Sequence, residues 1–297
     1  MLWIPVTVAA ALFQILRTSR QHELRGVLNT TAAGFVRFAY GVPLALLANV
    51  IVFGVLGRSL PGIPASFWPT IIAAGVLQIL GTVALLRAFK MRDFAVGTVY
   101  SKTEVLIVAL MGVVGLGVAL QPGGWIGVGL VTIGVLTLAA KGSWRTIIAG
   151  SADPAAWMGL LAATGFAGAA VGIGAASQSL TGAPAFDRAL FTMAILLTTQ
   201  TLINGAWFVF TDPSQLRQVA HAWRPAIWVG LFSLLGSLCW AWGFTLESAV
   251  KVRTLGQIEL IMAFVIAHLN LNEKHQRADY IASALVLIGV VLVTLLG

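Results

Sequence analysis

Ten apolar runs, each about the length of a membrane-spanning helix, divide almost the whole chain. A spanning helix needs roughly 20 mostly apolar residues. The runs cover residues 2–22, 30–56, 66–87, 95–118, 123–140, 155–179, 187–210, 224–246, 249–270 and 278–296. The turns that separate them are short and contain Pro, Gly, Asp or Asn. This pattern predicts an all-α integral membrane protein with ten transmembrane helices and no soluble domain.

The composition also indicates that lipid is the solvent of this chain. Only 9% of the 297 residues are charged, whereas a soluble domain carries about 25% charged residues. The net charge of +8 is scattered singly between apolar runs, without the basic stripe that nucleic-acid binding requires. We therefore expect a multi-pass protein of the cell (inner) membrane. Its expected partners are the lipid bilayer and a small-molecule substrate but no nucleic acid, and we expect a monomer or homodimer.

The sequence repeats itself at a distance of 155 residues, which aligns 71–142 with 226–297 without a gap. The matches include Gly75 with Gly230, Gly81 with Gly236, Glu104 with Glu259, and the run 133–135 with 288–290. Each half, 1–142 and 143–297, holds five spans. Because five is odd, the second half must enter the membrane in the opposite orientation, as in many secondary transporters. We therefore predict two inverted five-helix repeats.

The distribution of basic residues favours one orientation. Odd-numbered connections hold twelve Lys and Arg residues, and even-numbered connections hold four. The positive-inside rule then places the odd connections in the cytoplasm and both termini outside. Some of these basic residues, Arg17, Arg87, Lys251 and Arg253, are also candidates for cavity-lining helices, in which case they do not count as loop charges.

Two acidic residues, Glu104 and Glu259, lie in the middle of predicted spans and superpose in the repeat. An ionised residue at mid-bilayer is costly, so such residues usually face protein or water. One interpretation is proton coupling, because burial raises the pKa of a carboxyl group toward neutrality. The other is an ion pair or helix-to-helix hydrogen bond. The candidate partners are Lys102, Arg37, Arg87 and Arg253.

Polar residues within apolar spans are candidates for substrate binding, although such residues also hold helices together. Tyr100 and Trp240 could stack on a ring or a cation. The full set of substrate-binding candidates is Gln14, Arg17, Gln78, Thr82, Tyr100, Ser233, Trp240 and Gln257. No pair of histidines has metal-ligand spacing and Cys239 is the single cysteine, so we expect no metal, no cofactor and no catalytic residues.

The pattern at the end of the second half resembles the EamA-type members of the drug/metabolite transporter superfamily. It reads Gly256-Gln-Ile-Glu-Leu, then Leu271-Asn-Glu273-Lys, then Ala284-Leu-Val-Leu-Ile-Gly-Val290. The resemblance implies helices arranged around a central cavity, with spans 1, 3, 4, 6, 8 and 9 nearest to it. It also implies cytoplasmic termini, in conflict with the count of basic residues. Many relatives carry proline where Glu104 and Glu259 stand.

The favoured function is a secondary active transporter of a small organic metabolite, such as an amino acid or an amine, working as an exporter or exchanger with or without proton coupling. The nucleotide-binding pattern GxxxxGK[ST] is absent from the sequence, which excludes ATP hydrolysis by this chain. A passive facilitator or channel remains an alternative. An integral-membrane enzyme is disfavoured because the acidic residues are dispersed along the chain.

Overall fold

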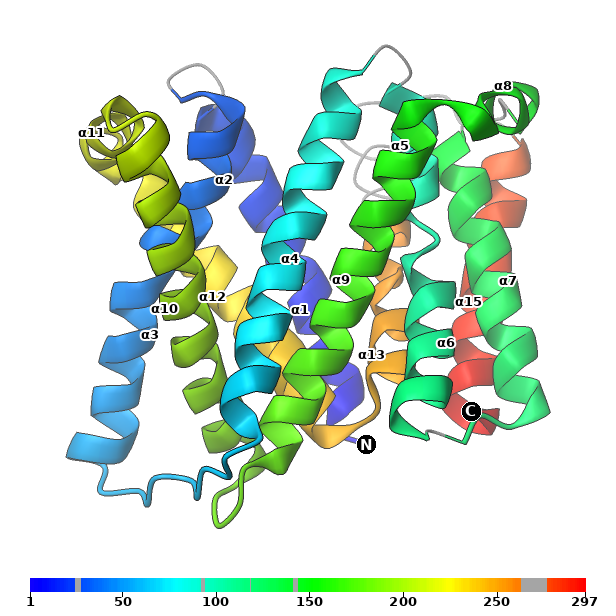
Figure 1. Cartoon of the computed structure of the whole chain (residues 1–297). Helices are drawn as coiled ribbons and strands as arrows, with labels where there is room; N and C mark the ends of the chain where they lie inside the picture. Colours follow the sequence, from blue (N-terminus) through cyan, green and yellow to red (C-terminus); the bar gives the residue numbers. More distant parts are fainter. Residues whose placement is uncertain (25–27, 92–93, 118, 141–143, 263–276) are drawn as a thin grey trace. The chain divides into compact units, whose positions relative to one another are not determined.

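The computed structural model describes the chain except for residues 25–27, 92–93, 118, 141–143 and 263–276 (Figure 1). The described part is built from helices and turns, with one isolated bridge between Gly62 and Thr181. Helices suit a lipid environment because they satisfy their backbone N–H and C=O groups within one segment. The predicted all-α class is confirmed. The motif at 271–274 lies outside the described residues.

Helices make up most of the described part of the chain. In chain order they are α1 (Trp3–Glu23), α2 (Thr30–Ala39), α3 (Gly41–Asn49), the π-helix η2 (Val50–Val55), α4 (Phe67–Lys90), α5 (Phe94–Ser101), α6 (Glu104–Leu116), α7 (Pro122–Ala140), α8 (Trp144–Ala149), the 3-10 helix η3 (Gly150–Ala152), α9 (Pro154–Ser179), α10 (Ala185–Thr211), α11 (Ser214–His221), α12 (Trp223–Leu246), α13 (Ala249–Gly256) and α15 (Arg277–Leu296).

Eight helical stretches within the described residues are long and apolar enough to cross a membrane. They are Thr31–Val55, Phe67–Ala88, Val96–Gly115, Pro122–Ala140, Pro154–Ser179, Ala185–Thr211, Trp223–Leu246 and Arg277–Leu296. They match eight of the ten predicted spans. The first predicted span forms α1, whose last turns carry Arg17 and Arg20. The ninth is described only up to residue 262, as α13 and the helical residues 258–262.

Two compact units make up the chain. The first comprises Met1–Val76 and Gly172–Leu246, and the second comprises Leu77–Val171 and Glu247–Gly297. Each unit therefore combines segments from both halves of the sequence. The boundary between the units falls within α4 and within α9.

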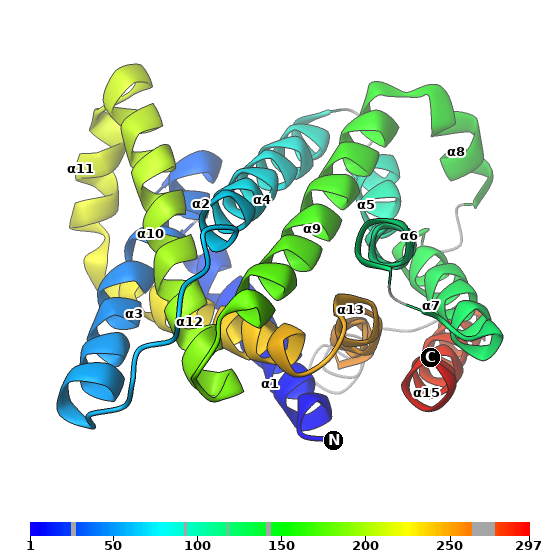
Figure 2. The ribbon, with the colours of Figure 1, turned by 60° about the horizontal axis from the view of Figure 1, so that its bottom comes forward.

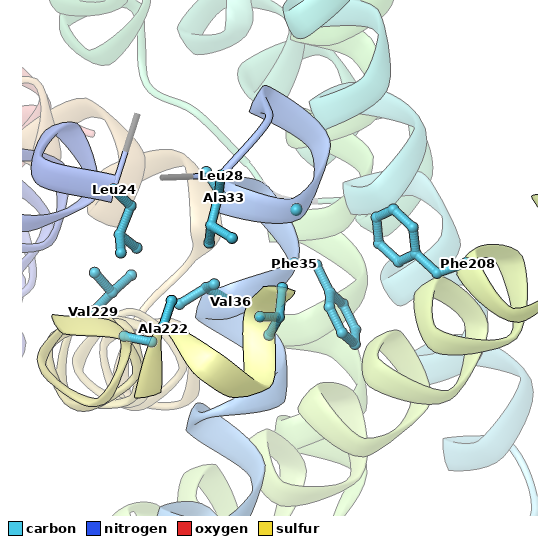
Figure 3. Close-up of a cluster of buried hydrophobic side chains, with 11 residues drawn as sticks. Leu24, Leu28, Ala33, Phe35, Val36, Phe208, Ala222 and Val229 are labelled. Atoms are coloured by element: carbon cyan, nitrogen blue, oxygen red, sulfur yellow. The ribbon is translucent and has the colours of Figure 1, made fainter. Parts of the chain in front are cut away.

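In the first unit, a hydrophobic cluster joins the end of α1 to α2, α10, α11 and α12 (Figure 3). Leu24, Val36 and Val229 are buried in it, and the rings of Phe35 and Phe208 lie 5.4 Å apart. Elsewhere in this unit α1 packs along α12, where a Cβ atom added to Gly236 would lie 3.4 Å from the Cβ atom of Phe13. Glycine thus allows two apolar helices to approach closely where lipid provides no hydrophobic drive.

In the second unit, α7 and α15 lie side by side along their whole lengths (Figures 1 and 2). A Cβ atom added to Gly127 would lie 2.7 Å from the carbonyl oxygen of Gly289. One added to Gly134 would lie 2.7 Å from the carbonyl oxygen of Ala282. Residue numbers rise along α7 as they fall along α15, so the two helices are antiparallel. We call this contact the α7–α15 seam.

Candidate functional site

The span that carries Glu104 is broken in the middle of the membrane-spanning stretch. Helix α5 ends at Ser101 and α6 begins at Glu104, with Lys102 and Thr103 forming a turn between them. The backbone N–H of Lys102 donates to the carbonyl of Val99 at 3.0 Å. This bond spans three residues instead of the four of an α-helix, so the turn is tighter than a continuous helix. Glu104 consequently occupies the first turn of a new helix segment.

The span that carries Glu259 is interrupted at the corresponding place. Helix α13 ends at Gly256, Gln257 forms a turn, and helical structure resumes over 258–262. The N–H of Gln257 donates to the carbonyl of Thr254 at 3.2 Å. This donor and acceptor are each 155 residues beyond Lys102 and Val99. Both glutamates therefore lie in the first turn of the second segment of an interrupted helix.

Glu104 forms an ion pair with Arg253, which lies in the last turn of α13. The guanidinium Nη2 donates to Glu104 Oε1. The side chains are only 12% and 17% exposed, so the two charges neutralise each other away from water. The positive end of the α6 dipole favours the same charged carboxylate. Among the four basic residues that the sequence offered as partners, the structure selects Arg253 for Glu104.

The two glutamates do not have identical surroundings. The residue that corresponds to Arg253 in the first half is Thr98, which has no charge. Glu259 is half-buried in the helical segment 258–262. The repeat thus preserves the two carboxylates and the two helix breaks, whereas the arginine occurs on one side only.

The remaining candidates of the second unit make mainly local contacts. Tyr100 packs against the buried cluster of Val96, Val99, Ala140 and Ala156. The turn at Lys102 and Thr103 separates Tyr100, near the end of α5, from Glu104 at the start of α6. Thr82 donates its hydroxyl to the carbonyl of Gln78 at 2.8 Å, and Gln257 donates its side-chain amide to the carbonyl of Arg253 at 3.3 Å.

The first unit holds the other four candidates. Trp240 Nε1 donates to Gln14 Oε1 at 3.2 Å, which ties α12 to α1. The indole of Trp240 also stacks on Phe244, with 5.9 Å between the ring centroids. Ser233 is buried, and its hydroxyl has no hydrogen-bond partner among the described residues. Arg17 follows Gln14 by three residues, so both lie on one face of α1.

Sequence reasoning missed three features. The breaks at 102–103 and 257 carry no proline, so only their repetition together with the glutamates could have indicated them. The ion pair of Arg58 Nη1 with Asp187 Oδ1, at 2.8 Å, joins the segment after η2 to the first turn of α10.

No group of three or more His, Cys, Asp or Glu side chains that could hold a metal occurs in the described ranges.

The comparison with known families decides the assignment. Residues 153–295 match the EamA-like transporter family. The second half of this chain belongs to that family. The EamA-like half contains α9 to α15, including the broken span with Arg253 and Glu259. Membership implies a membrane transporter of the drug/metabolite type. Family members are transporters, which agrees with the expectation that the chain is not an enzyme.

Solved structures resemble this chain in fold over its full length. Matches are found with 28 chains of solved structures. One, titled "Crystal structure of protein", is 15% identical, covers 99% of this chain and 96% of its own, and gives a TM-score of 0.73. At this identity the likeness concerns the fold. No curated protein matches the chain.

Proposed function

We propose that the chain is a secondary active transporter of a small organic solute, acting as an exporter or exchanger in the cell membrane. Its working parts would be two inverted five-helix repeats, 1–142 and 143–297. The observation that carries this proposal is the pair of matching helix breaks before Glu104 and Glu259. Broken helices at corresponding positions of two halves are a recurrent feature of substrate and ion sites in transporters.

The α7–α15 seam supports the inverted arrangement. Gly134 meets the carbonyl of Ala282 and the side chain of Val286. In the repeat alignment, Gly134 corresponds to Gly289, Ala282 to Gly127 and Val286 to Val131. The structure has the corresponding contacts as well: Gly289 meets the carbonyl of Gly127 and the side chain of Val131. The last spans of the two repeats, α7 and α15, therefore meet through equivalent residues, and they are antiparallel.

Other glycine contacts recur in the same way. In the second unit, a Cβ atom added to Gly81 would lie 3.2 Å from the ring of Phe166, on the first helix of the second repeat. In the first unit, its counterpart Gly236 packs against Phe13, on the first helix of the first repeat. The third span of each repeat, α4 or α12, thus packs its repeated glycine against the first span of the other repeat, α9 or α1.

These features suggest how the chain could alternate between two states. Two inverted repeats can exchange conformations and so provide outward-open and inward-open states of similar energy. Such an interruption can act as a hinge, because three-residue hydrogen bonds replace the four-residue bonds of an α-helix there. The ion pair joins α6 of one repeat to α13 of the other, so any movement that separates these segments must break it.

Protonation of Glu104 would remove the charge that holds Arg253. Removing one partner of a buried ion pair typically costs about 3–5 kcal/mol, so protonation could weaken the contact enough to permit movement. Both Glu104 and Glu259 remain our candidates for proton coupling.

Flux into proteoliposomes tests the proposal. Purified protein would be supplied with labelled amino acids, amines and organic acids under an imposed pH gradient. We expect uphill accumulation of at least one solute, abolished by an uncoupler and lost in Glu104→Gln and Glu259→Gln. Glu247→Gln is the matched control, because Glu247 lies in the turn between α12 and α13 and accepts a hydrogen bond from the backbone N–H of its neighbour Ser248.

The outcome also separates the alternative function. Downhill flux that equilibrates and never exceeds the outside concentration would identify a passive facilitator or channel. Uphill flux that persists unchanged in both glutamine variants would retain a transporter and reject proton coupling through these residues. Size measurements on the purified protein would distinguish the monomer from the homodimer, both of which the sequence permits.

A further inference from the structure

Two arginines in the first unit stand at one level of neighbouring helices. Helices α1 and α2 run in opposite directions (Figure 1), and the side-chain amide of Gln21 donates to the carbonyl of Ala33 at 2.8 Å. One helical turn before Gln21 is Arg17, and one turn after Ala33 is Arg37. This register places Arg17 and Arg37 at the same level of the two helices.

Arg37 differs from the other paired arginines in its partners. Arg253 faces Glu104, and Arg58 faces Asp187. Among the described residues Arg37 has no ion pair with a carboxylate, and its guanidinium carbon lies 4.8 Å from the ring centre of Phe38. Arg37 is half-buried within the candidate span Thr31–Val55. An arginine at membrane depth usually pairs with an acidic group or marks a substrate path.

We propose that Arg37 and Arg17 bind the carboxylate or phosphate group of the solute that this protein transports. Two planar guanidinium groups can bind the oxygens of such an anion through paired, charge-assisted hydrogen bonds. Transport of this anion rests on the proposed function, whereas its binding does not.

The two arginines are not required by the repeated scaffold. In the second half, α9 contains no Lys or Arg, and α10 has only Arg188, in its first turn. Nη1 of Arg188 donates to the carbonyls of Gln178 and Leu180 at the end of α9. The corresponding helices therefore fold without a pair of facing basic residues. The basic pair is a feature of one repeat, as expected of a group that recognises an asymmetric solute.

The polar strip on α1 extends this site. Gln14, Arg17 and Gln21 share one face of the helix at intervals of three and four residues. Gln14 accepts the hydrogen bond from Trp240, so this end of the strip is fixed against α12. The substrate class that fits is an organic acid, a phosphate ester or a zwitterion presenting its carboxylate. A purely cationic amine does not fit, because two positive charges would repel it.

Binding can be measured without transport. The protein would be placed in nanodiscs of phosphatidylcholine, and its thermal unfolding followed with benzoate, glycerol 3-phosphate and inorganic phosphate. The uncharged probes are benzamide and glycerol, and the cationic probe is benzylamine. We expect at least one anion to raise the unfolding temperature, and its uncharged and cationic relatives to leave it unchanged, because a ligand stabilises the state that it binds.

The variant Arg37→Gln should weaken the Kd of that anion at least tenfold. Arg224→Gln removes the same charge in the same unit from a residue that lies over the ring of Trp223, and should bind like the natural protein. If Arg37→Gln does not fold, Arg37→Lys and Arg17→Gln carry the test, and both should bind more weakly. Unchanged affinity in the folded variants would overturn the proposal, as would the lack of any anion effect.

Two further experiments distinguish a lipid phosphate from a soluble anion, and anion binding from transport. Discs containing phosphatidylglycerol test a lipid headgroup: if this lipid stabilises the protein through Arg37 while the soluble anions never do, the site is a lipid site and the proposal is wrong. Anion binding without flux in proteoliposomes would retain the site and reject transport. Flux of neutral or cationic solutes alone, unaffected by Arg37→Gln, would retain transport and reject the site.

Discussion

Gly134 of α7 and Gly289 of α15 occupy the same place in two copies of one helix contact. A Cβ atom on Gly134 would lie 2.7 Å from a side-chain methyl of Val286, and one on Gly289 would lie 2.7 Å from a side-chain methyl of Val131. The two valines, Val286 and Val131, are themselves counterparts in the repeat, as are the two glycines. Both helices are constrained at these positions, because a side chain added to either glycine would overlap the other helix.

The seam should respond strongly to a single methyl group. Gly134→Ala and Gly289→Ala should each destabilise the protein by about 1–3 kcal/mol, as expected of overpacking in a close contact. The control is Gly129→Ala, on the same helix, where an added Cβ atom meets nothing within 4 Å. Thermal unfolding in detergent measures the effect. Equal unfolding temperatures for all three variants would contradict the seam.

The ion pair should behave as a coupled unit. Glu104→Gln and Arg253→Gln each leave a buried charge without its partner, so each should cost about 3 kcal/mol. The double variant removes both charges and should be more stable than either single variant. A double-mutant cycle on unfolding free energies gives the coupling. Strictly additive losses would mean that the two side chains do not interact.

The hydrogen bond from Trp240 to Gln14 should contribute modestly to stability. Trp240→Phe keeps an aromatic ring beside Phe244 but loses the indole N–H, which should cost about 1 kcal/mol. Trp228→Phe is the matched control, because Trp228 is 52% exposed. Unfolding temperatures of the two variants provide the comparison. A greater loss in the Trp228 variant would count against the role of this bond.

The distribution of basic residues predicts which loops face the cytoplasm. Helix α11 and the residues after it carry Arg217 and Arg224, whereas the loop before α4 carries only Arg58. In a Cys239→Ala background, we expect Ser59→Cys to react with an impermeant maleimide added to intact cells, and Gln218→Cys to react only after permeabilisation. The reverse pattern would instead support the cytoplasmic termini that the family resemblance implies.

The sequence predicted the helical class and the positions of most spans, because bilayer thickness alone sets the length of an apolar run. It did not predict the breaks at 102–103 and 257, since Lys, Thr and Gln are ordinary helix residues. Repetition singled out Glu104, but four basic residues competed as its partner. Arg253 lies 149 residues away in sequence, and no local pattern reports such a contact. Arg37, first considered for Glu104, lies instead on α2, level with Arg17 on α1.

The α7–α15 seam also bears on how such a chain could arise. A surface that fits its own copy is self-complementary, so a lone five-helix half would already carry what it needs to meet a second copy inserted upside down. A small ancestral protein able to insert in both directions could therefore have worked as a pair. Fusion of two such genes would then fix one copy in each direction and free the halves to diverge, which is how an arginine pair could come to exist in one half alone.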